Sequence, residues 1–465
     1  MVKLHIKSNT YYDSVALMLI SKELKKLAGV NEALVGMGTD LNKEIAVRVG
    51  LDSPDLQKLS ANDFFIAVDY SDSDPDNYWQ KVLDKVEELL NSKKQSGSKG
   101  AYKPLTLSSA IEMIPGINLA LISVPGIYAA EVAMDCLMRD IHVMMFSDNV
   151  SLEDELRLKE FAVEKGLLMM GPDCGTAIIN NVPLAFANII RPGNIGIVGA
   201  SGTGTQEVSS IIDQLGGGVS QVIGTGGRDL KEEIGGLMFS LALDALIADK
   251  NTEVIVLISK PPSKTVQEKI IKQAENGGKP TVICFIGPDG LTLEDAAIKA
   301  VSLSKKQQIE SLEGFNKHLE VPQTQGKYIR GLYTGGTLCD EAMYIIGGDH
   351  TFIDFGDDTY TVGRPHPMID PSLRNEQIIK EASDPETAVI LLDCVIGYGA
   401  HENAAGELAQ TISQIKNKIV VASVCGTEND PQCLSASRKT LEDAGAFVFP
   451  SNAQAARFAK LVVRG

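Results

Sequence analysis

Two glycine-rich turns give this sequence its clearest chemical signal. The first lies within 193–207, where an apolar run passes into small residues and a helix is expected from about Gln206. The second lies within 390–406, where an apolar strand, a turn broken by glycines and the start of a helix follow one another. A strand that opens onto a helix N-terminus directs backbone N–H groups and the positive end of the helix dipole at one point. Two such turns predict a site for phosphate, or another small anion, held between two helix ends.

Residues of both turns are the predicted phosphate ligands. Their backbone N–H groups would surround the anion, and the hydroxyl groups of the first turn would add hydrogen bonds. The first turn is not a Walker loop, because no Lys-Ser or Lys-Thr pair follows its glycines. The alternative for this turn is a tight strand-to-helix connection with a Ser or Thr cap. The predicted ligands are Ser201, Gly202, Thr203, Gly204, Gly397, Tyr398, Gly399 and Ala400.

Three further side chains are candidates for contact with a substrate. Arg228 follows the turn 224–227 after an apolar strand, and its guanidinium suits bidentate pairing with a carboxylate or phosphate. The alternative is a surface arginine beside Asp229. His366 and His401 lie in polar segments rich in glycine or proline, where a role at a site and simple exposure to solvent both stay open.

The cysteines and histidines show no metal-binding pattern. Seven cysteines are scattered without a Cys-x-x-Cys pair, and six histidines form no His-x-x-x-His pair, so no metal site is predicted. Cys174 lies in a loop and carries a thiol that could serve in nucleophilic catalysis. The alternative for this residue is a small buried hydrophobic side chain. Scattered cysteines are typical of a reduced cytoplasmic protein.

Composition and charge argue against several classes of function. At 465 residues, with 44% hydrophobic and 22% charged residues, the chain suits about three or four globular domains. A net charge of −17 argues against general nucleic-acid binding, since nothing supplies a broad basic surface. The sequence contains no run of about 18 apolar residues, so no membrane span is predicted. The N-terminus lacks the apolar core of a secretory signal. We therefore expect a cytoplasmic protein that acts on small molecules.

Strands and helices alternate along the chain around these turns. Residues 1–92 are expected to hold a helix over 15–27, a strand over 63–68 and a helix over 78–90, before a polar linker over 91–100. From residue 101 onward, continuous apolar strands alternate with amphipathic helices, which favours an α/β fold with parallel sheets covered on both faces.

Two later segments repeat one order of elements. The segment 327–465 resembles 191–320 in its succession of strands and helices, as a diverged internal duplication would, and a polar linker over 305–326 joins them. In the segment before them, 101–190, a helix over 151–165 is expected with Ser151 as its cap. The strands expected within 191–320 are 196–198, 219–223, 254–258 and 281–285.

Several motifs in order carry a resemblance to a known family. They are Val124-Pro125, Gly171–Cys174, the strand Pro192–Val198, Ser201–Glu207, Ile223–Gly227, Phe352–Gly356 and the Gly397–Gly399 loop. With them, residues 115–300 resemble the α subunit of succinyl-CoA synthetase, and residues 327–465 resemble the C-terminal domain of its β subunit. More closely, the chain resembles the FdrA family of synthetase-like proteins.

The resemblance implies a division into four domains. They are a small N-terminal α/β domain over 1–92, a CoA-binding-like Rossmann domain over 101–190, and two flavodoxin-like domains. The first flavodoxin-like domain, over 191–320, is similar to the α subunit of succinyl-CoA synthetase. The second, over 327–465, is similar to the C-terminal domain of the β subunit. In the ligase family two helix N-termini face one phosphate from the α and β sides, and this chain carries both on one polypeptide. The ATP-grasp domain of the β subunit is not expected here.

The sequence departs from the ligase at the catalytic loops. Where the ligase has its catalytic histidine, residues 285–294 contain none, so no phosphohistidine is expected. The supporting glutamate loop becomes Ser259–Pro262, which puts Lys260 where a carboxylate stands and suits a free anion. The glycine-rich CoA fingerprint is also missing from residues 101–118.

FdrA-like proteins are linked to anaerobic allantoin and purine breakdown, which implies a subunit similar to oxamate carbamoyltransferase. Such an enzyme transfers a carbamoyl group from an N-carbamoyl amide to phosphate, with Lys260 or Arg228 stabilising the oxyanion and His366 and His401 contacting the substrate. The alternatives are an acyl-CoA synthetase that binds CoA, and a non-catalytic subunit. The resemblance implies either other subunits or a homo-oligomer. The candidate substrate or CoA contacts are Val124, Pro125, Gly126, Asp173, Cys174, Gly226 and Gly227.

Overall fold

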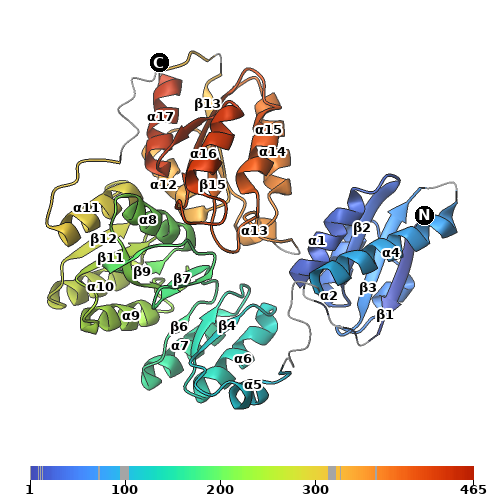
Figure 1. Ribbon diagram of the computed structural model, residues 1–465, viewed down its shortest axis with the longest axis horizontal. Coiled ribbons are helices and arrows are strands. Elements are labelled where there is room, and N and C mark those ends of the chain that lie inside the picture. The colour runs from blue at the N-terminus through green and yellow to red at the C-terminus, as the bar shows by residue number, and fades with distance from the viewer. Residues whose placement is uncertain are drawn as a thin grey trace. The chain divides into compact units, whose positions relative to one another are not determined.

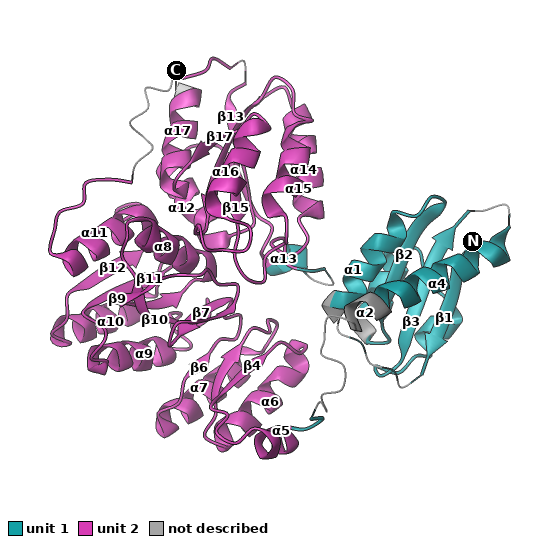
Figure 2. Ribbon diagram, viewed as in Figure 1, with its two compact units in different colours: residues 1–106, 358–365 teal, residues 107–357, 366–465 magenta. Residues whose placement is uncertain are grey.

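The computed structural model describes residues 2–8, 10, 12, 14–71, 74–94, 104–312, 321–324, 326–361 and 364–464. The chain divides into two compact units (Figure 2). Unit 1 comprises residues 1–106 and 358–365, and unit 2 comprises residues 107–357 and 366–465. Every residue predicted above as a ligand or catalytic group belongs to unit 2.

Unit 1 contains a three-stranded antiparallel sheet in the order β1-β3-β2. The central strand β3 is buried along most of its length, because both faces of the sheet are covered. Its side chains alternate between the faces: Phe64, Ile66 and Val68 join one apolar cluster, whereas Phe65 and Ala67 join another. The strands are β1 (Val2–Lys7), β2 (Val30–Met37) and β3 (Phe64–Tyr70).

The helices of unit 1 cover the two faces of this sheet. Residues of α1 and α4 complete one cluster, and residues of α2 and α3 complete the other. The two predicted helices and the predicted strand are confirmed as α1, α4 and β3, whereas β1 and β2 were not predicted, because polar residues interrupt their apolar pattern. Helix α4 continues four residues into the predicted linker, and residues 95–100 of that linker lie outside the described residues. The helices are α1 (Ser14–Lys25), α2 (Asp40–Arg48), α3 (Pro54–Gln57), α4 (Pro75–Lys94) and α13 (Asp358–Thr361).

Unit 2 contains three sheets (Figure 1). The first has three parallel strands in the order β4-β5-β6, and its apolar cluster joins these strands to α6 and α7. The predicted cap of α7 is confirmed, because Ser151 Oγ accepts the N–H of Asp154 at 3.0 Å. The elements are α5 (Leu107–Met113), β4 (Leu119–Ile122), α6 (Gly126–Met138), β5 (His142–Met145), α7 (Leu152–Lys165) and β6 (Met169–Met170).

The second sheet has the order β12-β11-β9-β10-β7-β8. Strands β9 to β12 are parallel and match the four predicted strands, while β7 and β8 form an antiparallel hairpin at one edge. Helices α8 and α11 pack together on one face, and α9 and α10 pack together on the other (Figure 1). The elements are β7 (Thr176–Ile179), β8 (Val182–Ala185), β9 (Pro192–Ala200), α8 (Gly202–Gln214), β10 (Val219–Gly224), α9 (Leu237–Ala248), β11 (Val254–Ser259), α10 (Lys264–Asn276), β12 (Thr281–Phe285) and α11 (Leu293–Lys305).

The third sheet has five parallel strands in the order β14-β13-β15-β16-β17. The predicted linker before it begins where α11 ends, and its residues 313–320 and 325 lie outside the described residues. The elements are β13 (Tyr328–Tyr333), α12 (Gly336–Ile346), β14 (Thr351–Asp354), α14 (Ser372–Ser383), β15 (Thr387–Val395), α15 (Ala404–Ile412), β16 (Ile419–Cys425), α16 (Leu434–Asp443), β17 (Phe447–Phe449) and α17 (Asn452–Arg464).

The second and third sheets share one hydrophobic core. A single apolar cluster includes residues of both sheets, and α8 contacts α11 and α12, while α12 contacts α17. Helices α8 and α12 follow the carboxyl ends of β9 and β13, which is where ligands bind in open α/β sheets. Packing in this core therefore brings two strand-to-helix turns together.

Candidate functional site

Helix α8 begins earlier than the sequence predicted. Ser201 is its N-cap, and Ser201 Oγ accepts the N–H of Gly204 at 3.0 Å. The helix thus starts at Gly202 and not near Gln206, because the hydroxyl cap makes the small residues part of the first turn. The first N–H groups of a helix have no partner within it, so those of Gly202 and Thr203 are directed beyond the helix start.

Helix α12 begins in a similar way after β13. Gly335 is its N-cap and has no side chain to cap the helix. The buried carboxylate of Asp393 instead holds the incoming turn, since it accepts the N–H groups of Thr334 and Gly335, both at 2.8 Å. Arg374 Nη1 donates to the same carboxylate at 3.0 Å. Burial raises the pKa of Asp393, although Arg374 and the donors of this turn lower it in part.

The two helix starts are in direct contact. Ser201 Oγ and Thr337 Oγ1 share a hydrogen bond of 2.6 Å. A Cβ atom on Gly335 would lie 2.7 Å from Thr203 Cγ2, so only glycine permits this close approach. The positive ends of two helix dipoles therefore meet at one place, which favours negative charge there.

A lysine and two aspartates surround the start of α12. Lys260 follows β11, and its Nζ lies 2.9 Å from Asp340 Oδ2. Asp354 ends β14, and a Cβ on Gly336 would collide with its carboxylate and lie 3.1 Å from Lys260 Nζ. We call Ser201–Thr203, Gly335–Thr337, Lys260, Asp340 and Asp354 the facing-helix site.

Electrostatics separates the roles of the charged groups in this site. Burial lowers the pKa of Lys260, whereas the negative charges of Asp340 and Asp354 raise it by more. The pKa of Lys260 therefore lies above its ordinary value, and the ammonium stays charged at neutral pH. Burial raises the pKa of Asp354 to about 6, against the opposing effects of the Gly356 N–H and of Lys260. Asp354 thus titrates near neutral pH and has the properties of a general acid or base.

The hydrogen-bond and ion-pair partners of Arg228 lie outside the facing-helix site. Its Nη2 donates to Val150 O at 2.9 Å and pairs with the buried Glu155 at 2.8 Å. Glu155 also pairs with the buried Lys159, whose Nζ donates to Asp229 at 2.7 Å. Arg228 therefore belongs to a network around α7, and a catalytic role for it stays a prediction.

The Gly397–Ala400 loop is partly engaged within the protein. The N–H of Gly397 donates to Gln432 at 3.0 Å, and the N–H of Tyr398 donates to the carbonyl of Ala187 at 2.9 Å. Helix α15 begins only at Ala404. Phosphate binding by this loop stays a prediction, with two of its expected donors already bonded.

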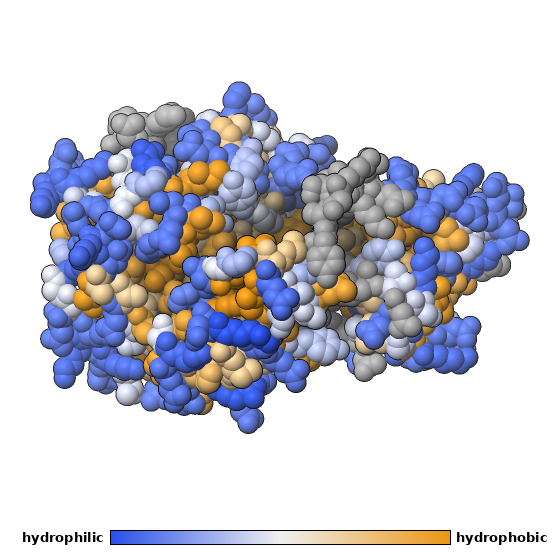
Figure 3. Space-filling model, turned by 60° about the horizontal axis from the view of Figure 1, so that its bottom comes forward, coloured by the Kyte–Doolittle hydropathy of each residue, from blue (hydrophilic) through white to orange (hydrophobic). Residues whose placement is uncertain are grey.

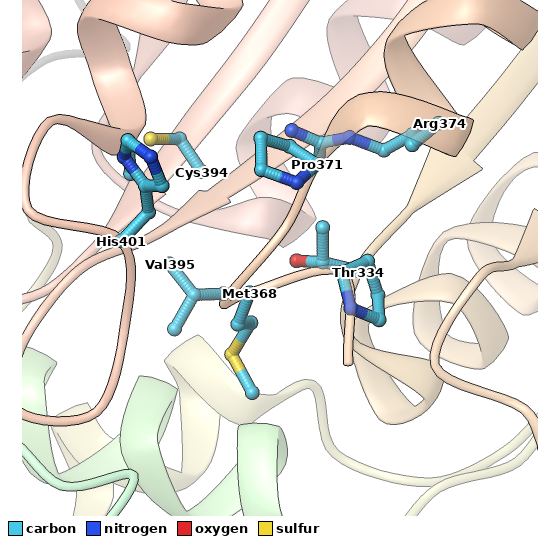
Figure 4. Close-up of a pocket in the computed structure, with 9 residues that line it drawn as sticks. Thr334, Met368, Pro371, Arg374, Cys394, Val395 and His401 are labelled. Carbon is cyan, nitrogen blue, oxygen red and sulfur yellow. The ribbon is translucent and has the colours of Figure 1, made fainter. Parts of the chain in front are cut away.

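The two candidate histidines lie in different surroundings. His366 packs against the ring of Phe186, with centroids 5.3 Å apart, and burial lowers the pKa of His366 to about 4. Its imidazole is therefore neutral at physiological pH. His401 lines a pocket beside β15, and its Nδ1 accepts the N–H of Asn403 at 3.1 Å (Figure 4).

Hydrogen bonds of Ser147 join the candidate CoA contacts at the ends of β4 and β5. Ser147 Oγ donates to Val124 O at 2.5 Å, and Ser147 O accepts the N–H of Asp173 at 3.0 Å. A Cβ on Gly226 would collide with the carbonyl of Pro172, so the 171–174 and 226–227 loops also meet. Pro125 is the N-cap of α6, which starts at Gly126.

Cys174 is a structural residue in this region. Its side chain is buried, and burial raises the pKa of its thiol to about 12. A Cβ on Gly224 would lie 2.6 Å from its sulfur, so the thiol is tightly enclosed. Because the thiolate is the nucleophile, Cys174 lacks the reactivity that nucleophilic catalysis requires.

Exposed apolar side chains lie at the start of α6. Ile127 is 77% exposed and Tyr128 is 48% exposed, directly after Pro125 and Gly126. Figure 3 brings the lower part of Figure 1, where β4–β6 lie, toward the viewer and shows hydrophobic residues among hydrophilic ones on this face. A helix start beside exposed apolar side chains fits a ligand that combines phosphate with an aromatic ring.

Sequence reasoning missed part of the facing-helix site. It did not assign roles to Thr337, Asp340 or Asp354, although the Gly335-Gly336 pair after an apolar strand repeats the signal of the Ser201 turn. Asp354 stands in a motif that carried the family resemblance, between Ile353 and Phe355. Only the packing of three separate elements brings these groups to Lys260.

Comparisons with known proteins identify the class of this fold. A CoA-ligase model matches residues 332–462, and a CoA binding domain model matches residues 190–287. With its parallel sheets and its two facing helix starts, the chain is a succinyl-CoA synthetase-like α/β protein. Within the described residues, no helix is both long enough and apolar enough to cross a membrane.

The chain belongs to the same family as YahF, an uncharacterized protein of Escherichia coli (strain K12). The two are 47% identical over an alignment 500 positions long, which covers 97% of this chain and 96% of YahF. This family is FdrA-like, as the motifs predicted, and a model described as "AllF, heavy metal-associated domain" matches residues 1–107.

More distant relatives match a smaller part. The α subunit 2 of succinate–CoA ligase from Archaeoglobus fulgidus is 31% identical over 147 residues, 31% of this chain and 50% of the relative. The chain therefore spans about half the length of such subunits. Among solved structures, the chain is similar to the dinucleotide-forming acetyl-coenzyme A synthetase 1 of Ca. Korarchaeum cryptofilum in complex with phosphate and ADP. The alignment covers 79% of this chain and 86% of the synthetase chain, at 15% sequence identity and a TM-score of 0.34.

The residues of unit 1 do not fit a heavy-metal site. Residues 1–107 contain no cysteine, the ligand that soft metals prefer. Among the described residues, no group of three or more His, Cys, Asp or Glu side chains could hold a metal ion.

Proposed function

We propose that unit 2 catalyses phosphate-dependent acyl transfer, with phosphate bound between the N-termini of α8 and α12. The observation that carries this proposal is the 2.6 Å contact between Ser201 and Thr337, which joins two helix starts beside Lys260. Two helix dipoles and one ammonium group supply the positive potential that a phosphate dianion needs. In the proposed complex, phosphate enters between the two hydroxyl groups and receives hydrogen bonds from both.

The charged side chains have complementary roles in this proposal. Lys260 neutralises the phosphate and stabilises the oxyanion that forms at the acyl carbon. Asp354, whose pKa is raised to about 6, accepts or returns the proton of the attacking or leaving group. Holding phosphate and acyl carbon together also lowers the entropic barrier to reaction.

The acyl carrier that the family models favour is CoA. The residues that would hold it are Val124, Pro125 and Gly126 at the start of α6, with Asp173 and the Gly226-Gly227 turn beside them. The exposed side chains of Ile127 and Tyr128 fit an adenine ring, and the α6 N-terminus fits a diphosphate. In this reaction a phosphate oxygen would attack the acyl carbon of an acyl-CoA, the C–S bond would break, and the CoA thiolate would take a proton as the acyl phosphate forms.

A second candidate function is the transfer of a carbamoyl group to phosphate. Lys260 lies between the carboxylates of Asp340 and Asp354, and this set of one donor and two acceptors matches the C=O and NH₂ of a carbamoyl group. In this reaction a phosphate oxygen attacks the carbamoyl carbon of an N-carbamoyl amide, and the C–N bond to the amide nitrogen breaks. The amide nitrogen takes a proton, and carbamoyl phosphate forms.

The described loop after β12 agrees with chemistry that needs no phosphohistidine. It lines a pocket against α12 with Ile286, Gly287, Pro288 and Gly290, and residues 285–294 contain no histidine. Phosphate would then act directly on the acyl group in either candidate reaction.

Isothermal titration of the full chain with phosphate, CoA and carbamoyl phosphate distinguishes these functions. Binding of both phosphate and CoA supports the acyl-CoA reaction. Binding of phosphate and carbamoyl phosphate without CoA supports carbamoyl transfer. Failure of phosphate to bind under any condition contradicts both.

A further inference from the structure

A cavity lies between the loop that follows β12 and helix α12. Its volume is about 100 Å³. The loop contributes Ile286, Gly287 and Leu291 to its wall, and α12 contributes Tyr344 and Ile345. We call this cavity the β12–α12 pocket.

The pocket is large enough for part of an organic molecule. A cavity of about 10–15 Å³ holds one water molecule, and an apolar cavity of about 150 Å³ binds benzene. A volume of about 100 Å³ therefore suits a group of about four or five carbon atoms.

One end of the pocket is closed, and the other end reaches solvent. Ile286 and Glu341 line the pocket and are only 3% and 2% exposed. Tyr344 is 36% exposed, and Pro288 is also an exposed lining residue. A ligand group that enters past Tyr344 thus buries its far end against Ile286.

The polar side chains that line the pocket already have partners in the protein. Glu341 accepts the N–H of Leu293 at 2.7 Å and the side-chain amide of Asn452 at 2.8 Å, one at each carboxyl oxygen. Thr292 Oγ1 donates to Asp295 at 2.6 Å. Burial raises the pKa of Glu341 to about 7, so this carboxyl does not carry a full negative charge at neutral pH. The pocket therefore favours an apolar ligand group over a charged one.

The pocket is linked to the facing-helix site at two points. Strands β11 and β12 are parallel neighbours, and the N–H of Ile286 donates to the carbonyl of Ser259 at 2.9 Å, directly before Lys260. On α12, Asp340 pairs with Lys260, and Tyr344 lies four residues further along. Residues at this spacing share one face of a helix and are separated by about 6 Å along its axis. A molecule a few carbon atoms long can therefore span both sites.

We propose that the β12–α12 pocket binds the apolar group of the substrate whose reacting carbon lies at the facing-helix site. The substrate class is then an acyl or N-carbamoyl compound with an alkyl group of about four or five carbon atoms. Contact of that group with Ile286, Leu291 and Ile345 removes apolar surface from water and adds to affinity. This inference rests on the proposed function and narrows its substrates by the size of their apolar group.

The probes for this proposal are alkylphosphonates, whose head group resembles phosphate and whose P–C bond resists hydrolysis. Phosphate, methylphosphonate and 3-methylbutylphosphonate are titrated calorimetrically into the full chain. The 3-methylbutyl compound should bind about tenfold or more tightly than methylphosphonate, because its additional carbon atoms leave water. A neutral probe, 3-methylbutanamide, observed by saturation-transfer NMR, should bind the pocket without any phosphate group.

Gly287→Leu fills the pocket and tests its role. A Cβ atom on Gly287 would meet no atom within 4 Å, so the new side chain has room. The variant should bind 3-methylbutylphosphonate no more tightly than methylphosphonate, keep its methylphosphonate affinity and lose the 3-methylbutanamide signal. The matched control is Asp289→Leu, which adds the same side chain at an exposed position of the same loop and should bind all probes as the wild type does.

Tyr344→Ser keeps the test decisive if Gly287→Leu does not fold, because Tyr344 is partly exposed. It should weaken binding of 3-methylbutylphosphonate several-fold and leave methylphosphonate affinity unchanged. Equal affinity of the wild type for the two phosphonates, or an unchanged preference in both variants, would overturn the pocket while phosphate binding still supports the proposed function. Binding of 3-methylbutanamide alone, lost in Gly287→Leu, would support the pocket and contradict the phosphate chemistry. Lack of binding by every probe would overturn both.

Discussion

Ser201 Oγ and Thr337 Oγ1 lie 2.6 Å apart although 136 residues separate them in the sequence. Each stands at the start of a helix whose first N–H groups lack partners within that helix. The contact therefore joins two sites of positive potential, one from each of two sheets. The proposed phosphate site depends on this contact.

The shared hydrogen bond should be measurable as a coupling between the two residues. Ser201→Ala, Thr337→Val and the double variant form a cycle, analysed by urea unfolding. We expect an interaction free energy of about 1 kcal/mol, typical of a partly buried hydrogen bond. Ser201→Ala alone should cost more than Thr337→Val, because it also removes the cap bond to Gly204. Additive effects of the two substitutions would contradict the contact.

Lys260 should contribute to anion affinity and not to folding. Lys260→Met removes the ammonium beside Asp340, and phosphate affinity measured by titration should fall about tenfold. The side chain is 47% exposed, so we expect a change in unfolding free energy within about 0.5 kcal/mol. Lys264→Met, at the start of α10, removes an exposed charge and serves as the control. Equal losses of phosphate affinity in both variants would mean that only net charge matters.

Asp354 should make phosphate binding depend on pH. Its pKa in the folded protein is about 6, above the ordinary value of 3.8, so the folded state holds the proton more tightly. Stability should therefore fall as pH rises from about 4 to about 6, by an amount on the order of 3 kcal/mol. At a fixed concentration of the phosphate dianion, binding should be tighter below pH 6, where the neutral carboxyl of Asp354 no longer repels it.

Asp354→Asn is the variant that tests this assignment. It should flatten the pH profile of phosphate binding and raise stability at pH 7 relative to the wild type, as thermal unfolding would show. A profile that keeps its step near pH 6 in the variant would assign the titration to another group.

Asn452 should hold α8 and α12 in place through two buried carboxylates. Its N–H donates to Glu207 at 3.0 Å, and its side-chain amide donates to Glu341 at 2.8 Å. Burial raises the pKa of each glutamate to about 7, against the opposing effect of their hydrogen bonds. The folded state thus binds these protons more tightly, and stability should fall as pH rises from about 4.5 to about 7.

Asn452→Ala removes the side-chain donor to Glu341 and should cost about 2–4 kcal/mol in urea unfolding. The cost should be larger at pH 8 than at pH 6, because an ionised Glu341 then lacks its partner. Asn276→Ala, at the exposed end of α10, is the control and should change stability by less than about 0.5 kcal/mol. A cost that is the same at both pH values would separate Asn452 from the titration of Glu341.

The parallel sheets could be predicted because their strands are continuous apolar runs. Segments 254–258 and 281–285 are confirmed as β11 and β12 to within one residue. The hairpin of β7 and β8 was missed, although Asn180 and Asn181 form its turn with φ of 49° and 64°, a conformation that asparagine tolerates. Strands this short show too little alternation of apolar and polar residues to be recognised in the sequence.

The candidate site was predicted only in part, for a physical reason. Ser201 to Gly204 are read from one local pattern of strand, small residues and helix. The partners of Lys260 come from α12 and β14, and their approach depends on packing across the shared core. Arg374 gave no signal at all, because an arginine within an amphipathic helix looks like any solvated residue until its burial is known.

Titration of phosphate into the wild type and Thr203→Asp shows whether phosphate binds between the N-termini of α8 and α12. The aspartate would place a negative charge at the start of α8, where Thr203 contacts Gly335. We predict one phosphate per wild-type chain and a loss of about tenfold or more in Thr203→Asp, with affinity largely kept in the neutral Thr203→Asn. Equal phosphate affinity in the wild type and Thr203→Asp would contradict a phosphate site between these two helices.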